Sequence, residues 1–492
     1  MERQPVRGVA LTDAVRRPAR GVSRLRFGLG ALGLTREELA WLSGSLLAIA
    51  VAMAAFLRVA TLRWNSFETN AFDLAFFDQI IFNTSRGRWF DTSFIPYNFA
   101  GQHVQPILVA YVPAYWLGAG PYFLMVSQAV VGALAAVPLF FFARKLGLHA
   151  AIATAAVVAY LANPYLHRAM AFDFHPEVMA GFPVFFAAWA IAADRRRLAV
   201  VSTLSVLAFK EDTVFLALAL AGYMWIRDLR REAMLTAGVA LGWALLGVFV
   251  VMPLVRDGQA SDLVQRFGYL LPHRTVADFL LVPLRAAKVL LAPAQLWTMA
   301  LFIGASSLVV LWRPVYLVVL VPGLGLALLS THGVQRHLEF HYAAELVPLI
   351  VVAALLAAVS LRERISTAAV AVAVVAPPLL AAAVFHPLAD GHAGSPSAQH
   401  RTAVLAALAL VPGDENVSVS AQTGLLPRIA HHRGAYEFPD GFEHADWIVV
   451  DRSGVRSSRT TEAGWAEKLE TVSRTKKLVF AEDGVEVYRG AP

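Results

Sequence analysis

Carboxylates set among apolar side chains mark the first stretch of this sequence that could carry chemistry. Residues 67–103 read FETNAFDLAFFDQIIFNTSRGRWFDTSFIPYNFAGQH and place Glu68, Asp73 and Asp78 among Phe, Leu and Ile. A carboxylate against an apolar surface costs free energy unless it is solvated, paired or used. On a helix, a spacing of five residues corresponds to about 500°, so Asp73 and Asp78 would point roughly 140° apart. We expect Asp73 to act as a general base towards a hydroxyl, with Asp78 as the second candidate; the alternative is an interfacial helix whose acids reach water.

Acid, histidine and acid alternate in a second stretch, AFDFHPEVMA, at Asp173, His175 and Glu177. In an extended turn this spacing points the three side chains the same way. They could then hold a divalent cation, Mg²⁺ or Mn²⁺, or His175 could position a phosphate. The alternative is a polar loop in which Pro176 and Glu177 begin the next helix. That alternative leaves Asp173 and His175 unexplained.

Three charges lie in a tight turn between two apolar runs in the third stretch, FKED, which contains Lys210, Glu211 and Asp212. Charges in such a place usually face a cavity inside a helix bundle or pair with each other. We expect Lys210 to neutralise a lipid phosphate, and Glu211 or Asp212 to bind or orient a metal ion. An ordinary hydrated turn is the alternative.

Histidines and an arginine gather in the fourth stretch, THGVQRHLEFHYAAE, over residues 331–345. His337 and His341 are four residues apart and would share a helical face, but the HExxH pattern is not met, which argues against a zinc protease. The fork of Arg336 matches phosphate oxygens, so we expect Arg336, with His337, to bind a phosphate; the alternative is a helix end stabilised by these side chains. The same pocket is expected to include Glu68, His103, His332 and His341.

The composition indicates that membrane helices position these four stretches. Of the residues, 58% are hydrophobic and only 16% are charged, whereas soluble domains have about 25% charged residues. Repeated apolar runs of about 17–25 residues indicate helices, because the runs lack the alternation of barrel strands and only helices or closed barrels satisfy the backbone in lipid. We expect an all-α polytopic fold with about eleven spans, at residues 40–60, 121–143, 149–166, 177–193, 198–209, 213–226, 234–254, 293–312, 314–330, 342–360 and 365–385.

Charge placement predicts which way the helices run. The segment 104–118 is short and contains two prolines, so we expect it to lie along the membrane surface rather than to cross. The basic clusters between spans then fall on the cytoplasmic side, as the positive-inside rule requires. The N-terminal tail, residues 1–39, holds eight Arg against four acids and is expected to be cytoplasmic; no nucleic-acid partner is expected. In this multi-pass plasma-membrane topology all four polar stretches, and the whole loop 63–120, are extracytoplasmic.

A second domain is expected after the last apolar run. Residues 387–399 form a polar linker with Gly and Ser, and residues 400–492 have the pattern of a small soluble α/β domain on the extracytoplasmic side. Residues 416–421 and 446–451 read as buried strands, and a Glu-Asp-Gly turn between two apolar runs near the end predicts a hairpin. The chain has no cysteine, which excludes disulfides and a thiolate nucleophile.

Several motifs resemble, in order, landmarks of the DUF2079 family of predicted membrane proteins: FDLAFFDQIIFN, GQHVQPILVAYVPAYWL, FDFHPEVMA, LAFKEDTVFLAL and ADWIVVD. That family in turn resembles the GT-C superfamily of polytopic glycosyltransferases, which take a sugar from a polyprenyl-phosphate carrier on the extracytoplasmic face. The resemblance implies that residues 40–386 form a GT-C-like domain and that the loop 63–120 contains juxtamembrane helices. It also implies that the catalytic acid is Asp73 or, as second choice, Asp78.

These expectations combine into one hypothesis, an integral membrane glycosyltransferase that moves a sugar from a polyprenyl-phosphate donor to an envelope glycan or lipid acceptor. Phosphate would leave, and Lys210, Arg336, His175 or a divalent cation would offset its charge. One alternative is a lipid or solute transporter or flippase, which would place ionisable residues near mid-membrane and show inverted repeats. A non-catalytic membrane scaffold is the other.

Overall fold

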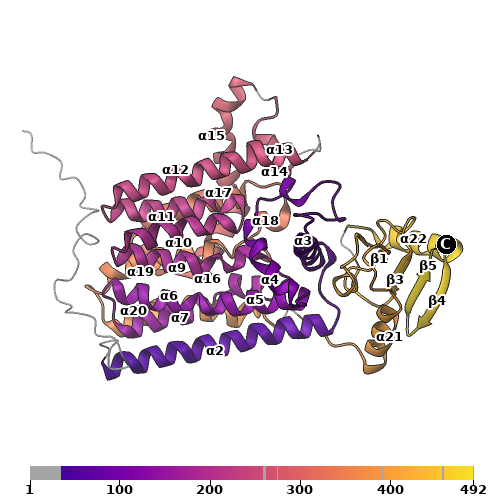
Figure 1. The fold of residues 1–492 in the computed structure, drawn as a ribbon. Helices are drawn as coiled ribbons and strands as arrows, with labels where there is room; N and C mark the ends of the chain where they lie inside the picture. Colours follow the sequence, from indigo (N-terminus) through magenta and orange to yellow (C-terminus); the bar gives the residue numbers. More distant parts are fainter. Residues whose placement is uncertain are drawn as a thin grey trace, which may run out of the picture.

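The computed structural model describes residues 35–256, 258, 262–273, 275–389, 392–456 and 459–490. Figure 1 shows a long bundle of helices with a small α/β domain at one end, next to helix α3. Of the predicted basic tail, residues 1–39, the part up to residue 34 lies outside the described residues. The first described helix, α2 (Arg36–Asn65), begins at a capping box in which the side chains of Thr35 and Glu38 each accept from the other's backbone N–H.

Four continuous helical runs among the described residues are long and apolar enough to span a membrane: Arg36–Asn65, Pro121–Lys145, Arg230–Val255 and Thr367–Phe385. A bent pair, Val276–Leu290 and Pro293–Ser306, meets the same criterion together, with a 67° bend at its break. The other predicted spans contain shorter helices. The described chain thus has four or five helices of spanning length, and the count of about eleven crossings stays a prediction.

Most long helices of the bundle after α2 lie in the predicted apolar runs, but the apolar helix at Val276–Leu290 lies in none of them. In chain order the elements after α2 are η1 (Ala71–Ala75), α3 (Phe76–Ser85), η2 (Phe99–Gly101), η3 (Pro106–Tyr111), α4 (Val112–Trp116), α5 (Pro121–Leu134), α6 (Ala136–Lys145), α7 (Ala150–Leu161), α8 (Pro164–Met170), η4 (Pro176–Ala180), α9 (Gly181–Ala192), α10 (Arg196–Ser205), η5 (Val206–Ala208), η6 (Glu211–Thr213), α11 (Val214–Ile226), α12 (Arg230–Leu246), η7 (Gly247–Val251), α13 (Met252–Val255), α14 (Asp262–Phe267), η8 (Gly268–Leu270), α15 (Val276–Leu290), α16 (Pro293–Ser306), η9 (Val309–Trp312), η10 (Pro314–Leu320), α17 (Val321–Leu328), α18 (Gly333–Arg336), α19 (Leu346–Leu361) and α20 (Thr367–Phe385).

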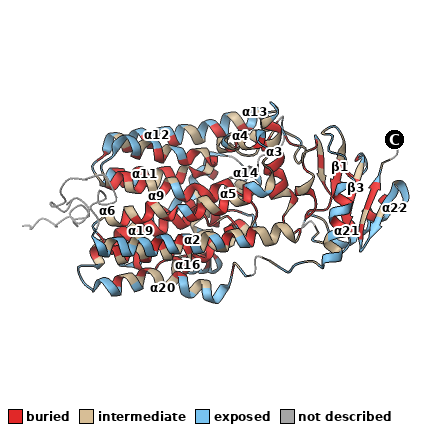
Figure 2. Cartoon of the chain, turned by 60° about the horizontal axis from the view of Figure 1, so that its bottom comes forward, coloured by how far each residue is buried: buried red, intermediate tan, exposed pale blue. Residues whose placement is uncertain are grey.

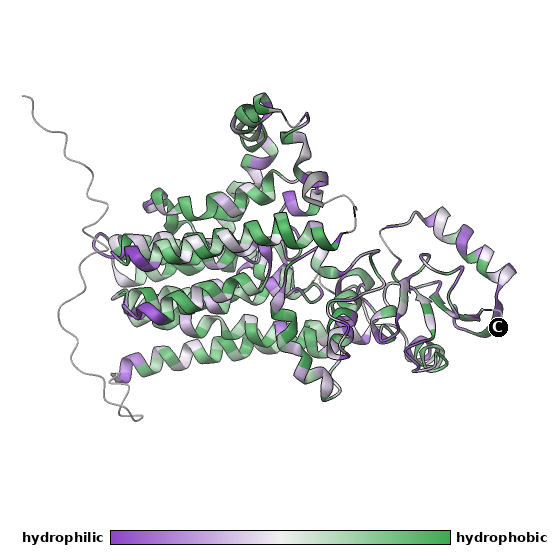
Figure 3. Cartoon of the chain, turned by 45° about the horizontal axis from the view of Figure 1, so that its top comes forward, coloured by the Kyte–Doolittle hydropathy of each residue, from purple (hydrophilic) through white to green (hydrophobic). Residues whose placement is uncertain are grey.

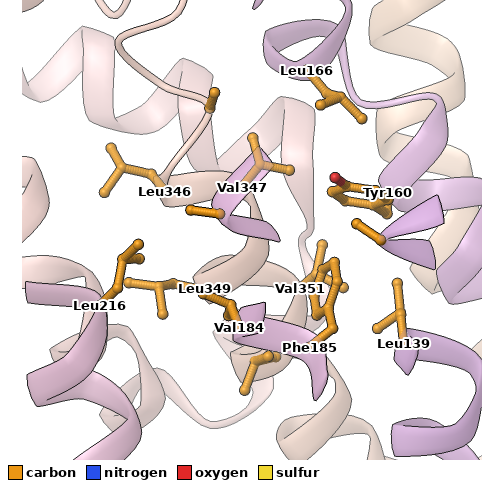
Figure 4. Packing of buried hydrophobic residues seen from close by; sticks show 14 of the residues in the cluster. Leu139, Tyr160, Leu166, Val184, Phe185, Leu216, Leu346, Val347, Leu349 and Val351 are labelled. Atoms are coloured by element: carbon orange, nitrogen blue, oxygen red, sulfur yellow. The ribbon is translucent and has the colours of Figure 1, made fainter. Parts of the chain in front are cut away.

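Helix α19 forms the centre of the bundle. Nearly all of its side chains are buried, as expected of a helix that is hydrophobic on every side. Its Leu349 and Val351 lie in one buried cluster with Val184 and Phe185 of α9 and Leu216 of α11 (Figure 4). Figure 2 shows exposed residues gathered on the outer helices, and Figure 3 shows hydrophobic residues along most of the bundle. Many large apolar side chains are exposed on the outside of the bundle. Such a surface suits contact with lipid.

The α/β domain contains a five-stranded sheet of order β2-β1-β3-β5-β4. Its elements are α21 (Ala398–Ala409), β1 (Ser418–Ala421), η11 (Leu426–Arg428), β2 (Gly434–Glu437), β3 (Trp447–Asp451), α22 (Glu462–Thr475), β4 (Lys477–Glu482) and β5 (Val485–Arg489). Strands β2, β1 and β3 are parallel, and β5 and β4 add an antiparallel hairpin. The two predicted buried strands contain β1 and β3, and the predicted hairpin turns at Asp483 and Gly484, both with positive φ. Strand β2 was not predicted.

The first loop of the bundle completes the hydrophobic core of the α/β domain. Helix α22 covers one face of the sheet, whereas the other face packs on α21 and on Phe67, Ala71 and Ala75 of the loop. The approach is so close that a Cβ on Gly424 would lie 2.1 Å from the carbonyl oxygen of Phe67. The backbone N–H of Ala71 also donates to Thr423 Oγ1 at 3.0 Å. The domain is therefore fixed directly over η1 and α3.

Candidate active site

Polar side chains from separate segments meet at the end of the bundle that faces the α/β domain (Figure 1). They are Asp73 in η1, His175 and Glu177 at the start of η4, Lys210 before η6, and His341 after α18. Asp73 Oδ1 lies 3.5 Å from His175 Nε2, and Glu177 Oε1 lies 3.9 Å from Lys210 Nζ and 3.8 Å from His341 Nε2. These five side chains, named the polar cluster, contain one member or more from each of the four stretches that the sequence singled out.

Asp73 lies on a short π-helical turn whose start is held by Asp173. The fully buried Asp173 carboxylate accepts from the backbone N–H of Asn70 at 2.6 Å and from its side-chain amide at 2.8 Å, and it pairs with Arg63 Nη2 at 3.0 Å. Turns of this π type are rare and often occur at functional sites. Asp173, predicted as a metal ligand, thus anchors η1 and sets the direction in which Asp73 points.

His175 lies behind Asp73, away from the surface. The Asp73 side chain is 26% exposed and the His175 side chain 8%. The backbone N–H of His175 donates to Gln128 Oε1 at 2.7 Å, and its Nδ1 lies 3.3 Å from the carbonyl oxygen of Asp173. A neutral ring in this position carries its proton on Nδ1 and turns the Nε2 lone pair towards Asp73. Asp73 is therefore the accessible member of the pair.

Burial and neighbouring charges decide the protonation of this pair. Burial raises the pKa of Asp73 well above its usual value, and the carboxylates of Asp173 and Glu437 add to the rise. Burial lowers the pKa of His175 to about 3, against the opposing effect of Asp173. The imidazole is therefore neutral at neutral pH, and the Asp73 carboxylate is a stronger base than an ordinary aspartate.

A second imidazole stacks on the first. The ring centroids of His175 and His341 are 3.5 Å apart with an interplanar angle of 14°, and the ring of Tyr342 lies 4.2 Å from that of His341. Burial lowers the pKa of His341 well below its usual value, and His175 and Lys210 lower it further, so the stacked rings are both neutral. The Nδ1 atom of His341 is buried and has no hydrogen-bond partner among the described residues.

Carboxylates enclose Lys210. Its Nζ lies 3.0 Å from Asp212 Oδ2 and 3.9 Å from Glu177 Oε1. Burial acts to lower the pKa of Lys210, but the carboxylates of Asp212, Glu177, Glu345 and Glu211 outweigh it and raise that pKa well above its usual value. Lys210 is therefore charged, and its charge is balanced within the cluster. It joins the FKED turn to the loop that precedes η4.

Glu211 ties the beginning of the segment 104–118 to the same turn. Its Oε1 lies 2.9 Å from His103 Nδ1, and its Oε2 accepts from the backbone N–H of Val104 at 3.0 Å. The next residue, Gln105, donates to Glu177 Oε2 at 3.5 Å. The short helices η3 and α4 are therefore attached to the polar cluster at their N-terminal end.

The carboxylates predicted as metal ligands do not form one ligand set. Asp173 is bonded to Arg63 and Asn70, Glu211 to His103, and Glu177 and Asp212 share the ammonium of Lys210. Within the part of the chain that the structure describes, no group of three or more His, Asp and Glu side chains could hold a metal ion. These residues do not fit a Mg²⁺ or Mn²⁺ site, and no reaction step is assigned to a metal.

Asp78 and Glu68 face the α/β domain rather than the polar cluster. The fully buried Asp78 accepts from the Tyr115 hydroxyl at 2.6 Å and lies 2.9 Å from His431 Nε2. Glu68 Oε2 lies 2.8 Å from His392 Nδ1 in the linker. The divergence expected of Asp73 and Asp78 is therefore present, and it separates a carboxylate at the candidate site from one that holds the domain in place.

The prediction that His337 and His341 share a helical face is wrong. Helix α18 ends at Arg336, and Leu338 and Phe340 have φ of 57° and 51°, which no right-handed helix allows. His337 is exposed at the turn, whereas His341 is carried inward and buried. The positive φ values occur at two non-glycine residues, so no glycine marks the break in the sequence.

Two arginines bind the segment that precedes His341. Arg336 Nε donates to the carbonyl oxygen of Ser330 at 2.7 Å, and Arg266 Nη1 donates to Gln335 Oε1 at 3.0 Å. The charge of Arg266 acts on His341, where it contributes to the lowered pKa. His332 is exposed on the same segment. Arg266 comes from α14, and its hydrogen bond to Gln335 brings it to this segment.

Three residues that organise the cluster were not predicted: Arg63, Asn70 and Gln128. A signal was available for Arg63, because a charged residue in the last turn of an apolar helix is usually paired or functional. Asn70 and Gln128 carry no such signal. Their partners, Asp173 and His175, are distant in the sequence, and single-sequence patterns do not reveal such pairings.

The chain matches one family model over most of its length. That model is described as a predicted membrane protein (DUF2079), and it matches residues 63–486. Among solved structures, the chain is similar to the oligosaccharyltransferase of Archaeoglobus fulgidus in complex with Zn and sulfate, with a TM-score of 0.44 and 14% identity over 90% of this chain and 73% of that chain. No curated protein matches this chain. The polar cluster, rather than this likeness, indicates the function.

Proposed function

The chain belongs to the DUF2079 family of predicted membrane proteins, and we propose that it is a membrane glycosyltransferase in which Asp73 is the general base. One observation carries the proposal: an accessible carboxylate with a raised pKa lies 3.5 Å from a neutral, buried imidazole, that of His175. A general base works best when its pKa lies near the working pH and its conjugate acid has an acceptor nearby. Burial moves the pKa of Asp73 upwards, towards the working pH, and His175 Nε2 is the nearby acceptor.

The reaction balances with these residues alone. Ionised Asp73 takes the proton of an acceptor hydroxyl while the hydroxyl oxygen forms a bond to the anomeric carbon of the donor sugar. The bond from that carbon to the phosphate oxygen breaks, and the polyprenyl phosphate leaves with the electron pair. The lone pair on His175 Nε2 then accepts a hydrogen bond from the protonated Asp73 carboxyl and stabilises it.

The negative charge of the leaving phosphate has to be balanced by a positive group. Lys210 is not free for this role, because its ammonium is already paired with Asp212 and Glu177. We place the phosphate at the forks of Arg336 and Arg266, with exposed His337 beside them, because guanidinium forks match phosphate oxygens. His175 adds no charge, because its ring is neutral.

The position of the cluster favours an enzyme over a transporter. Transporter sites are built near mid-membrane, between repeats and at broken helices. The polar cluster lies instead at the end of the bundle, next to the α/β domain (Figure 1). A lipid-linked donor, with its chain in the bilayer and its head group at the surface, would meet the protein at that end. We propose that this end is extracytoplasmic and that an envelope glycan or lipid is the acceptor.

The test is the substitution Asp73→Asn, which removes the base and keeps the shape of the side chain. We expect kcat for sugar transfer from a synthetic polyprenyl-phosphate sugar to fall by about 10²–10⁴-fold. In the wild type, kcat should fall as the pH drops through the raised pKa of Asp73, because protonation removes the base.

The matched control is Asp91→Asn, which removes an exposed acid from the same loop and should keep full activity. Equal loss in both variants would assign the effect to the loop rather than to the base. Full activity in Asp73→Asn would refute the proposal.

A further inference from the structure

A cavity separate from the polar cluster lies under the α/β domain. Its volume is about 440 Å³, within the range of about 300–1,000 Å³ typical of small-molecule sites. Four segments enclose it: residues 66–68 after α2, residues 393–397 of the linker, the loop that follows β1 and the loop that follows β3. Asp73 does not line this cavity, although it follows residues 66–68 closely in the chain.

The cavity occupies the position where parallel sheets bind ligands. Strands β1 and β3 are parallel neighbours, and the chain leaves β1 for β2 on one side before it returns to β3 on the other. Ligands of open α/β sheets bind outside the carboxyl ends of the strands at such a switch point. Gln422 follows β1, and Asp451 ends β3; both side chains line the cavity.

His400 of α21 stands at the centre of the polar wall. Its Nε2 lies 2.9 Å from Asp451 Oδ2, and its Nδ1 lies 3.1 Å from Asp483 Oδ2. Burial acts to lower the pKa of His400, but Asp451 and Asp483 outweigh it and raise that pKa. Both ring nitrogens therefore donate, and the ring is charged below that pKa.

This arrangement binds rather than cleaves. Ser453 Oγ lies 3.5 Å from His400 Nε2, which resembles the start of a catalytic triad, but the Nε2 atom already faces Asp451. The Ser453 hydroxyl donates to Asp451 Oδ1 at 2.8 Å. An imidazole held between two carboxylates has no lone pair with which to activate a serine.

The opposite wall joins the bundle to the linker. Glu68 Oε1 accepts from the backbone N–H groups of Ala393 and Gly394 at 3.1 and 3.2 Å, which fixes the linker over the cavity. Ser66 and Phe67 continue this wall from the end of α2.

The charges of the walls select the chemistry of the ligand. The carboxylates of Asp451 and Glu68 line the cavity, and Asp483 holds His400 from behind, so negative charge outweighs the His400 imidazolium and a phosphate or another anion is disfavoured. The imidazole, the Ser453 hydroxyl and the linker N–H groups already donate to these carboxylates, whose oxygens keep further lone pairs that accept from hydroxyl groups. A neutral molecule rich in hydroxyl groups suits such an acceptor-rich cavity.

We propose that this cavity binds a neutral sugar unit of a glycan, through the His400–Asp451 pair and the residues 66–68. The inference that the cavity binds sugar depends only on the cavity. Its further role is to hold one unit of an acceptor glycan while another unit of the same glycan reaches Asp73, and this role rests on the proposed function. The segment 66–73 joins the two sites, so a bound glycan is placed beside the general base.

The experiment measures binding of labelled neutral hexose and N-acetylhexosamine oligosaccharides to the purified full-length chain, with uronic-acid oligosaccharides as the anionic comparison. The variant Ser395→Trp fills the cavity from the exposed linker. The variant His400→Gln removes the imidazole that Asp451 and Asp483 hold in the cavity wall. We expect at least tenfold weaker binding of the neutral set in both variants. The matched control is Ser473→Trp, on the exposed face of α22, which should bind as the wild type does.

The variant Asp73→Asn separates this inference from the proposed function. This variant should lose sugar transfer but bind the neutral oligosaccharides normally. If the wild type bound them without transferring sugar, the proposed function would be refuted and the cavity assignment would remain. Preference for the anionic set, failure of the wild type to bind any neutral oligosaccharide, or unchanged binding in Ser395→Trp would each overturn the inference.

Discussion

At the scale of single residues, the site depends on how each acid is partnered rather than on how many acids are present. Asp73 and Asp173 both lie in polar loops next to apolar segments. Asp173 accepts three hydrogen bonds and is fully buried, so its charge is used for structure, whereas Asp73 keeps an accessible edge and a raised pKa. The first arrangement is that of an anchor and the second that of a base.

The anchoring role of Asp173 predicts a loss of stability. Asp173→Ala leaves Arg63 without its buried partner, and removing one partner of a buried pair costs about 3 kcal/mol or more. The thermal midpoint of the detergent-purified protein should fall accordingly, measured against Asp194→Ala. That control breaks an exposed pair with Arg196 and should change stability by less than about 1 kcal/mol. An equal midpoint in the two variants would show that Asp173 is not an anchor.

The sequence predicted which stretches would meet but not which atoms would pair. Alternation at Asp173, His175 and Glu177 was expected to aim all three side chains at one ligand, yet each has a different partner on another segment. Long-range pairings of this kind depend on tertiary packing, which local spacing does not encode. The prediction for Asp73 and Asp78 held better, because it needed only the geometry of one helix.

At the scale of elements, the junction between the first loop and the α/β domain determines where Asp73 lies. Helix α3 carries Asp78, whose partner His431 comes from the domain and stacks on Phe82 with centroids 4.0 Å apart. Gln79 donates to the carbonyl oxygen of His432, and Ser93 donates to that of Ala435. The domain therefore stabilises η1 and α3 from outside, as the bundle does through Asp173.

The Asp78–His431 pair predicts a pH-dependent junction. Burial acts to lower the pKa of His431, but Asp78 outweighs it, with Glu415 adding to the rise and Arg86 opposing it. A raised pKa means that this contribution to stability is complete below the unfolded value of about 6.5 and is lost as pH rises through the folded value. Hydrogen exchange of the α3 backbone should therefore quicken with rising pH beyond the intrinsic trend.

His431→Gln is the variant that isolates this effect. It should exchange faster at low pH and lose the extra pH dependence, because an amide does not titrate in this range. If the wild type and His431→Gln showed the same pH profile for α3, the pair would have no part in the junction.

The strands show the same division between local and tertiary information. Strands β1 and β3 and the hairpin were predictable, because they are short apolar runs bounded by turn residues. Strand β2, GAYE, has neither feature and is a strand only because β1 offers it a parallel edge. Helix α18 ends early for a comparable reason, since burial of His341 outweighs the helical pattern of its sequence.

At the scale of the whole molecule, apolar composition predicted the helical bundle, and charge placement predicted a polar end. The structure places the polar cluster, the cavity and the α/β domain at that same end of the bundle (Figure 1). The shared core between the first loop and the sheet was not predictable, because Phe67, Ala71 and Ala75 read as part of a membrane-surface helix. The domain is thus part of the site rather than an appendage.

The expected orientation of the bundle has a direct test in this cysteine-free chain. Thr331→Cys lies exposed in the loop before α18, and Arg197→Cys lies exposed in the basic first turn of α10. A membrane-impermeant thiol reagent should label the first in intact cells and the second only after permeabilisation. The reverse pattern would place the polar cluster in the cytoplasm.

The central claim is that Asp73 supplies a base, and chemical rescue tests it most directly. Asp73→Ala leaves a space where the carboxylate was, so added formate, a small carboxylate, can enter and accept the acceptor's proton. We predict that this variant transfers sugar at a small fraction of the wild-type rate without formate and recovers at least tenfold as formate is added, while Asp91→Ala does not respond. Wild-type rates in Asp73→Ala without formate would contradict the assignment.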